Sequence, residues 1–402
     1  MDVLVYPSRL CGTLIAPPAK STLHRALIAA AFADRPTRLC LQRQDGISDD
    51  IAATIRCLQA LGAKIVVQRQ EIYVQPAKET PRQPVLDCGE SGSTLRFLLP
   101  VTAARCDAFR IHGRGRLLQR PLADLQAAMS EHGCVFHSDA GSLLVRGQLQ
   151  GGDFSLPGAV TSQYVSGLLL AAPLFAAGCR ISLCSALESA GYVLLTCQVM
   201  QAFAVAVSSA PDRFIVQPGA YHSPSCFIVE GDWSNAAFWL AAAHLGHAVE
   251  VKGLTNASAQ PDRVLPRLLP CLGKGAEIDV SACPDLLPVL AVLAACAEGE
   301  THFIRAARLR LKESDRLHGM ACGLTALGVH VVETADALSV SGGQLHGGEV
   351  DGCGDHRLVM AWAVAALAAD APLRICGAEA VAKSYPAFWQ DYQQLGGRCD
   401  VL

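Results

Sequence analysis

Charged side chains are scarce in this 402-residue sequence and make up only 17% of it. Acidic and basic residues nearly balance, and the formal net charge is -3 at pH 7. Such a balance gives the chain no general attraction to nucleic acid or to an anionic membrane surface. Any binding of an anion must therefore depend on a local cluster of cations.

Long uninterrupted apolar runs are also missing, although 51% of the residues are hydrophobic. The longest stretch without a charge, from Phe154 to Cys179, contains Pro157, Pro173 and several polar residues, so we expect a buried helix there and no membrane span. The first residues have neither the basic nor the apolar region of a secretory signal. This start predicts a cytoplasmic protein.

The 17 cysteines include no C-x-x-C pair. They stand singly in alanine- and leucine-rich segments, as small buried apolar residues do in a reducing compartment. The pattern predicts neither a disulfide framework nor a metal site. The chain also has no Walker-type phosphate loop and no G-x-G-x-x-G sequence between a strand and a helix, which argues against nucleotide binding by either of these routes.

What the sequence does contain is a repeated pattern, in which a helix ends near a glycine and an apolar strand, a polar turn and a second strand follow. Such a repeat is too long for a solenoid, so each copy predicts a complete α/β unit. The middle of the pattern falls at 228–232, which predicts two similar domains. The copies begin near Leu58, Met129, Met200, Leu272, Leu324 and Leu395.

The stretch from Ala16 to Ala31 contains the first candidate site for an anion. Two prolines lead into an alanine- and leucine-rich helix whose first turns carry Lys20 and Arg25, and Ser21 is its predicted N-cap. Free N–H groups and the positive end of the helix dipole would meet two cations there. An ordinary capped helix with solvated cations is the alternative interpretation of this stretch alone.

Other candidate anion-binding groups stand at the starts of later predicted helices. The segment from Gly89 to Leu99 is a small flexible loop that opens a helix with Arg96 in its early turns, although a tight turn before a core helix is an equal alternative. Arg120 precedes another helix, and residues 161–163 add hydroxyl and amide donors to a third.

The second half of the chain adds a carboxylate and more cations. Asp285 stands alone before an almost wholly apolar helix and is either a helix cap or a general base. The segment from Arg308 to Arg316 is densely charged, which is typical of a solvated face or of a binding site. Arg357 and Lys383 occupy similar positions farther along.

These motifs, taken in order from Lys20 to Pro386, resemble those of the 5-enolpyruvylshikimate-3-phosphate synthase family. They are K-S-x-x-x-R, G-x-S-G-S-T-x-R, R-P, T-S-Q, P-D-x-x-P, L-K-E-S-D-R, G-D-H-R and K-S-Y-P. Each motif is weak alone, but the set is specific because it stands in register over nearly the whole chain.

The resemblance implies an α/β enolpyruvyl transferase fold, an inside-out α/β barrel of two similar domains. Each domain would consist of three βαβαββ-type units, with a ligand cleft between the domains. Residues 1–15 and 231–402 would form one discontinuous domain and residues 16–230 the inserted domain. Hinge crossings would lie near 16–20 and 228–232.

The implied activity is transfer of the enolpyruvyl (1-carboxyvinyl) group of phosphoenolpyruvate to the 5-hydroxyl of shikimate 3-phosphate, with release of phosphate. This step belongs to the shikimate pathway of aromatic amino acid biosynthesis, and the family is the target of glyphosate. A cytoplasmic monomer is implied, with no metal, no organic cofactor, and no nucleic acid or membrane partner. Both substrates are anionic, which would explain the clustered cations.

The resemblance also assigns roles to residues. Asp285 would accept the proton of the attacking hydroxyl, Glu313 would take part in proton transfer at the methylene carbon, and Lys20 would assist at the leaving phosphate. The shikimate 3-phosphate site would consist of Lys20, Ser21, Arg25, Thr161, Ser162, Ser189, Tyr192, Asp285 and Lys312. The phosphoenolpyruvate site would consist of Lys20, Gly92, Arg120, Gln163, Arg316, Arg357 and Lys383.

Several positions depart from the family pattern. Glu90 and His24 stand where asparagine is common, and Glu90 beside an anion site would need a neighbouring arginine to neutralise it. Ala19 replaces a serine, Arg308 replaces an asparagine, and 190–191 replaces a Lys-Pro pair. The charged residues with assigned roles are all retained.

Two alternatives remain at this point. The transferase acting on UDP-N-acetylglucosamine has Lys-Asn where this chain has Lys20 and Ser21, and a reactive cysteine where this chain has 119–121. A non-catalytic anion-binding protein of the same fold is the alternative from another class. Retention of Asp285, Glu313 and Lys383 together argues against it.

Overall fold

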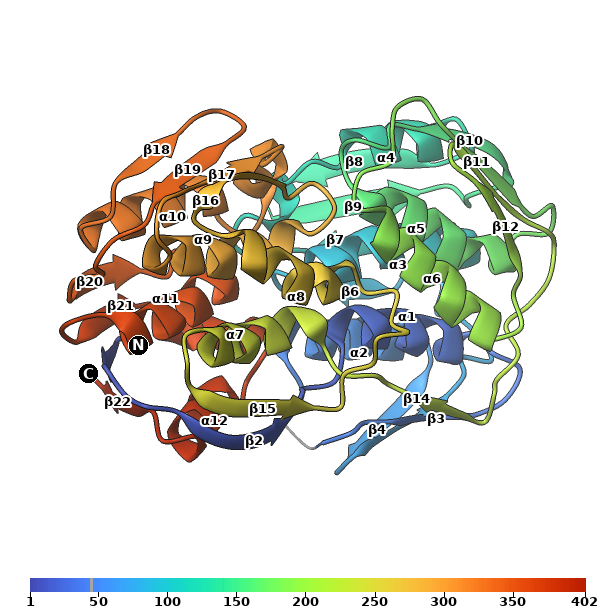
Figure 1. Ribbon diagram of the computed structural model, residues 1–402. Coiled ribbons are helices and arrows are strands. Elements are labelled where there is room, and N and C mark those ends of the chain that lie inside the picture. The colour runs from blue at the N-terminus through green and yellow to red at the C-terminus, as the bar shows by residue number, and fades with distance from the viewer. Residues whose placement is uncertain (44–45, 140) are drawn as a thin grey trace. The chain divides into compact units, whose positions relative to one another are not determined.

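The computed structural model describes residues 1–43, 46–139 and 141–402 and is shown in Figure 1. The chain divides into two compact units. Unit 1 consists of Met1–Pro17 and Gly231–Leu402, and unit 2 consists of Pro18–Glu230. The chain therefore passes from one unit to the other twice, after Pro17 and after Glu230. That these crossings act as hinges between domains stays a prediction.

Unit 2 contains the first helices of the chain and most of its strands. Its helices are α1 (Lys20–Ala31), α2 (Asp49–Ala60), α3 (Gly92–Arg105), α4 (Ala123–Ser130), α5 (Ser162–Ala171) and α6 (Ala190–Ala202), with the 3-10 turns η1 (Leu117–Gln119) and η2 (Ala172–Leu174). Its strands are β3 (Thr37–Cys40), β4 (Lys64–Gln68), β5 (Glu71–Gln75), β6 (Val85–Asp87), β7 (Ala108–His112), β8 (Val135–Asp139), β9 (Ser142–Arg146), β10 (Gly152–Leu156), β11 (Cys179–Leu183), β12 (Val207–Ala210), β13 (Arg213–Val216) and β14 (Cys226–Ile228).

Unit 1 is built from both ends of the chain. Its strands are β1 (Val3–Tyr6), β2 (Cys11–Ile15), β15 (Ala248–Lys252), β16 (Lys274–Asp279), β17 (Glu300–Ile304), β18 (Val331–Glu333), β19 (Leu338–Ser341), β20 (Gly348–Asp351), β21 (Leu373–Cys376) and β22 (Arg398–Val401). Its helices are α7 (Trp233–His244), α8 (Leu265–Leu268), α9 (Leu287–Cys296), α10 (Arg316–Ala326), α11 (His356–Ala368) and α12 (Phe388–Gln394). Its 3-10 turns are η3 (Pro261–Val264), η4 (Leu269–Cys271), η5 (Pro284–Leu286), η6 (Ala307–Leu311) and η7 (Ala378–Lys383).

The same sheet topology recurs along the chain. Each four-stranded sheet has one parallel pair followed by antiparallel pairs, as in the order β6-β7-β9-β8. In unit 2 the other orders are β10-β11-β13-β12 and β14-β3-β5-β4, and in unit 1 they are β16-β17-β19-β18 and β20-β21-β1-β22. The described residues of β15 and β2 form a two-stranded sheet. This repetition confirms that the chain is built from repeated α/β units, as the sequence pattern predicted.

The repeated sequence pattern has a structural counterpart, with one correction. The copies near Leu58, Met129, Met200 and Leu324 are each a helix end followed by an antiparallel hairpin. The copy near Leu395 ends α12, and its strand β22 pairs with β1. The copy near Leu272 was interpreted wrongly, because β16 pairs in parallel with β17. No hairpin follows β16, because the next elements along the chain are η5 and α9.

The start of α1 also differs from the prediction. The helix begins at Lys20, its N-cap is Ala19, and Ser21 lies inside the first turn. The extended conformation of Ala19 is held by a hydrogen bond that its N–H donates to the carbonyl oxygen of Glu230. This contact with a distant residue determines where the helix starts and overrides the capping preference of serine.

Each unit has its own core, in which the central helices are buried on nearly all sides. In unit 2, α3 and α5 are buried over most of their length and pack against each other. In unit 1, α9 and α11 form the corresponding pair. No helix in the described part of the chain is long and apolar enough to span a membrane.

The contact between α3 and α5 depends on Gly167. A Cβ atom at this position would lie 2.3 Å from the carbonyl oxygen of Arg96 and 3.2 Å from Pro100. Pro100 has no N–H, so it cannot donate the usual helical hydrogen bond to the carbonyl oxygen of Arg96. Because Gly167 has no side chain, α5 can approach this part of α3.

We expect Gly167→Ala to lower the free energy of unfolding by about 1–3 kcal/mol, because the added methyl group forces the two helices apart. Denaturant unfolding followed by circular dichroism would measure the change. Gly343→Ala is the matched control, since a Cβ at Gly343 would meet no atom within 4 Å. Equal stabilities of the two variants would show that α3 and α5 are not in close contact at Gly167.

Candidate active site

In unit 1, a nearly buried arginine gathers acids from separate segments. Arg316 is the first residue of α10, and its side chain is 2% exposed. Its Nη1 donates to Asp285 Oδ1 at 2.7 Å, and its Nη2 donates to Glu313 Oε2 at 2.8 Å. Its Nε and Nη2 also donate to the two oxygens of Asp355 at 2.8 and 3.3 Å. The guanidinium is thereby fixed in place and fully compensated in charge.

Asp355 connects this cluster to the next helix. It is fully buried and is the N-cap of α11, where its Oδ1 accepts a hydrogen bond from the backbone N–H of Arg357 at 2.9 Å. Its Oδ2 also accepts from Ser314 Oγ at 3.1 Å. One carboxylate therefore orients both Arg316 and the start of the helix that carries Arg357.

Asp285 is the point on which the cations of unit 1 converge. It lies in η5, partly exposed, just before the apolar helix α9. Besides Arg316, its oxygens meet Lys312 Nζ at 3.3 Å and Arg357 Nη2 at 3.5 Å. Burial acts to raise the pKa of Asp285, but the positive charges of Lys312, Arg316 and Arg357 outweigh burial and hold this pKa well below its ordinary value. The carboxylate is consequently ionised throughout the neutral range.

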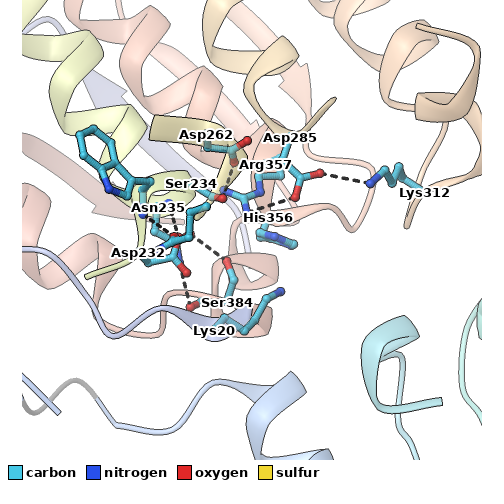
Figure 2. A network of polar contacts seen from close by, with 12 residues as sticks. Lys20, Asp232, Ser234, Asn235, Asp262, Asp285, Lys312, His356, Arg357 and Ser384 are labelled. Atoms are coloured by element: carbon cyan, nitrogen blue, oxygen red, sulfur yellow. Dashed lines mark hydrogen bonds and ion pairs between the residues drawn. The ribbon is translucent and has the colours of Figure 1, made fainter. Parts of the chain in front are cut away.

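Arg357 and Lys312 retain capacity for a ligand. The Nε and Nη1 groups of Arg357 are buried and have no hydrogen-bond partner among the described residues. Burial lowers the pKa of Lys312, an effect that Asp285 opposes. A buried donor without a partner is costly, so the two Arg357 groups are suited to an anionic ligand. Figure 2 shows Arg357, Asp285 and Lys312 together with the polar groups that surround them.

Lys383 also belongs to unit 1, at the end of η7. Its Nζ donates to the carbonyl oxygen of Gly354 at 2.7 Å, one residue before Asp355. The neighbouring Ser384 exchanges hydrogen bonds with Asn235 of α7. These contacts join the K-S-Y-P segment to the G-D-H-R segment and to α7.

In unit 2, Lys20 is paired with an acid that the sequence analysis did not assign to the site. Its Nζ lies 2.7 Å from Asp50 Oδ2 in the first turn of α2, and both side chains are largely buried. In the sequence, only the position of Asp50 in the acidic first turn of α2 could have drawn attention to it as a site residue. His24 donates to or accepts from Thr54 Oγ1 at 2.7 Å, and burial together with Lys20 and Arg25 lowers the pKa of His24. His24 is thus a neutral hydrogen-bonding group, like the asparagine it replaces.

Arg25 links helices in the core of unit 2. Its Nε donates to Thr196 Oγ1 at 2.7 Å, its Nη1 to the carbonyl oxygen of Ser21 at 2.6 Å, and its Nη2 to that of Tyr192 at 3.0 Å. Its guanidinium also lies 4.8 Å from the ring centroid of Phe97. The structure therefore brings Ser21, Arg25 and Tyr192 together, and these bonds join α1 to α6.

The remaining predicted residues of unit 2 stand at the starts of α3, α5 and α6. Thr161 is the N-cap of α5 and accepts a hydrogen bond from Gln163 N, and the buried Ser162 is the first residue of that helix. Ser189 is the N-cap of α6 and has a left-handed conformation with φ of 54°. Helix N-termini are suited to bind anions.

A glycine at the start of α3 makes room for two arginines. A Cβ at Gly92 would lie 2.7 Å from Arg120 Nη1 and 2.8 Å from Arg96 Nη1. Arg96 Nη1 donates to Gln163 Oε1 at 3.2 Å, and Gln163 Nε2 donates to Ser93 Oγ at 2.9 Å. Gly92, Arg120 and Gln163 thus lie together with Arg96. Their role in binding phosphoenolpyruvate stays a prediction.

The structure places Glu90 beside Gly115. Its side chain is exposed, and its carboxylate lies beside Gly115, at 2.8 Å from the position that a Cβ would take there. Arg308 lies in η6, half-buried, and its charge acts on Lys312. No group of three or more potential metal ligands was found in the described part of the chain.

Comparisons with known proteins agree with these motifs. Residues 5–392 match the model of a family described as EPSP synthase (3-phosphoshikimate 1-carboxyvinyltransferase). Relatives named 3-phosphoshikimate 1-carboxyvinyltransferase from Clostridium acetobutylicum and Clostridium kluyveri are each 37% identical to the chain. The matches cover 98% and 99% of this chain and 97% and 98% of the relatives.

Solved structures show the same fold. An EPSP synthase from Acinetobacter baumannii matches with a TM-score of 0.81 at 23% identity, covering 100% of both chains. The enolpyruvyl transferase NikO from Streptomyces tendae matches with a TM-score of 0.77 at 19% identity, covering 99% of this chain and 98% of the other.

We expect Asp355→Asn to lower the free energy of unfolding by about 3 kcal/mol, because it leaves the buried Arg316 guanidinium without the fully buried carboxylate among its counter-charges. Chemical denaturation would measure the loss. Asp370→Asn is the matched control, since Asp370 pairs with His346 on the surface and its loss should change stability little. If Asp355→Asn were as stable as Asp370→Asn, Asp355 would not be required to compensate the charge of Arg316.

Proposed function

The chain belongs to the EPSP synthase family, and we propose that the cation clusters of its two units are the substrate sites of this enzyme. Members transfer the enolpyruvyl group of phosphoenolpyruvate to the 5-hydroxyl of shikimate 3-phosphate and release phosphate, in the shikimate pathway of aromatic amino acid biosynthesis. The observation that carries the assignment of residues is the convergence of Lys312, Arg316 and Arg357 on Asp285.

Asp285 is the proposed general base. In the unliganded protein its low pKa makes it a weak base, because three cations stabilise its charged form. An anionic substrate bound to the same cations neutralises part of their charge and raises the pKa of Asp285. The carboxylate then accepts the proton of the 5-hydroxyl as that oxygen attacks C2 of phosphoenolpyruvate. Substrate binding thereby creates the base strength that the reaction needs.

The other catalytic roles follow the positions of the charged groups. Glu313 is held by Arg316 and is proposed to take part in proton transfer at the methylene carbon. Lys20 is proposed to stabilise the departing phosphate, with Asp50 keeping its ammonium group in place. Addition of the hydroxyl oxygen to C2 and of a proton to the methylene carbon gives a tetrahedral intermediate. Loss of phosphate together with one proton of the new methyl group restores the double bond and completes the transfer.

The substrate contacts are proposed as follows. Shikimate 3-phosphate is assigned to Lys20, Ser21, Arg25, Thr161, Ser162, Ser189, Tyr192, Asp285 and Lys312. Hydrogen bonds of Arg25 also join α1 to α6. Phosphoenolpyruvate is assigned to Lys20, Gly92, Arg120, Gln163, Arg316, Arg357 and Lys383. Action as a cytoplasmic monomer stays a prediction from the sequence.

We expect Asp285→Asn to reduce kcat by about 10²- to 10⁴-fold, as the loss of a general base does. Phosphate release with both substrates present would measure turnover, and calorimetry would show shikimate 3-phosphate binding within about tenfold of the wild type. Asp370→Asn should retain wild-type turnover. More than half of the wild-type kcat in Asp285→Asn would contradict the assignment of the base.

We expect Gly92→Ala to raise the KM for phosphoenolpyruvate by about tenfold or more, because the added methyl group displaces the guanidinium groups of Arg96 and Arg120. The KM for shikimate 3-phosphate should change much less. Steady-state kinetics would separate the two, with Gly343→Ala as the control. An equal increase in both KM values would indicate general damage to unit 2 and not a specific contact.

A further inference from the structure

Asp262 is a buried carboxyl group of unit 1 to which no role in the reaction has been assigned above. It lies in η3, which packs against α7 and leads into α8. Its side chain is 0% exposed, and its Oδ2 accepts a hydrogen bond from Ser234 Oγ in the first turn of α7. Its Oδ1 has no hydrogen-bond partner among the described residues. Figure 2 shows Asp262 beside Ser234, close to Arg357 and Asp285.

The segment that carries Asp262 is held firmly. Two residues earlier, Gln260 accepts a hydrogen bond from Trp233 N at 2.9 Å and donates to the carbonyl oxygen of Gly231 at 2.8 Å. Gln260 is itself 2% exposed. The carboxyl group of Asp262 therefore cannot swing out to water without breaking the contacts between η3 and the start of α7.

Titratable and charged groups reach Asp262 from each neighbouring segment. Asp285 and the thiol of Cys283 come from the segment before α9, Asp232 from the N-cap of α7, and Arg357 from α11. The adjacent Arg263 is turned outward, where its Nη1 donates to the carbonyl oxygen of Asn256. Arg357 is consequently the cation that acts on this carboxyl group.

A charge on Asp262 is costly in these surroundings. Burial and the like charge of Asp285 raise the pKa of Asp262 to about 7, although Arg357 and the Ser234 hydroxyl act in the opposite direction. The group is therefore neutral in weakly acidic solution and becomes negative as the pH rises through neutrality. This change of charge acts on Arg357, whose Nε and Nη1 have no hydrogen-bond partner in the part of the chain that the structure describes.

We propose that Asp262 is a positioning residue that sets how strongly Arg357 binds the anionic substrate. This rests on the proposed assignment of Arg357 to phosphoenolpyruvate. With Asp262 neutral, Asp285 is the acid that competes with substrate for Arg357. With Asp262 ionised, a second negative charge attracts the guanidinium group and repels the substrate, so affinity falls as the pH rises.

The test compares the wild type with Asp262→Asn over a range from about pH 6 to about pH 9. Asparagine has nearly the same shape, and its carbonyl oxygen can accept from Ser234, but it cannot ionise. We expect the wild-type KM for phosphoenolpyruvate to rise by about tenfold more over this range than that of the variant. The kcat of the variant should stay within about twofold of the wild type.

The ratio of the two KM values is the readout, because the phosphate of the substrate titrates equally with both enzymes. Asp370→Asn should follow the wild-type curve throughout. Ser234→Ala removes a hydrogen bond that favours the ionised form of Asp262, so the rise in KM should move to higher pH. Thermal melting of each variant would confirm that it is folded.

A KM that depends on pH equally in the wild type and in Asp262→Asn would overturn the proposal. So would a loss of kcat at every pH without a change in the pH dependence of KM, which would indicate a structural role only. Arg357→Gln separates this inference from the proposed function. If Arg357→Gln leaves the KM for phosphoenolpyruvate unchanged, the assignment of Arg357 fails and the inference fails with it. If it raises KM while Asp262→Asn behaves as the wild type, only the inference about Asp262 fails.

Discussion

The buried guanidinium group of Arg316 is the charge on which the site in unit 1 depends. A cation that is 2% exposed must be compensated by acids at hydrogen-bond distance, and Asp285, Glu313 and Asp355 supply them from different segments of the chain. Each acid also has a second role. Asp285 is the candidate base, Glu313 is the candidate proton-transfer group, and Asp355 caps the start of α11. The positive charge of Arg316 therefore holds these three features together. Burial acts to lower the pKa of Arg316, but these acids outweigh it and keep the group charged.

The helix N-termini explain why an acidic chain can bind highly charged anions. In both units, buried helices begin next to cations: α1 with Lys20, α3 with Gly92 between two arginines, and α11 with Arg357. The positive dipole end of each helix adds to the charge of these cations, so few charged side chains are needed. A chain with a low net charge can therefore have a strongly positive electrostatic potential at the starts of these helices.

Acids inside the cationic clusters determine what those clusters can do. Lys20 is paired with Asp50 and Arg357 with Asp285, so neither cation is present as an isolated charge before substrate binds. Under the proposed assignment, a substrate anion competes with these carboxylates for the two cations and raises the pKa of Asp285. The proposed function therefore couples substrate binding to proton transfer through the ion pair of Arg357 with Asp285.

Local sequence determined much of this protein. The alternation of helices, glycines and strands predicted repeated α/β units, and the motifs from Lys20 to Lys383 identified the family, because capping, chain reversal and the chemistry of phosphate binding are read from neighbouring residues. Only the tertiary structure decided that β16 opens a sheet and that Ala19, not Ser21, precedes α1, since partners far along the chain fix both. The sequence likewise did not reveal that Lys20 pairs with Asp50, that the buried Asp355 pairs with Arg316, or that Asp262 is fully buried. A carboxylate's charge and partners depend on which distant groups surround it and how much water they exclude, and no local pattern encodes either.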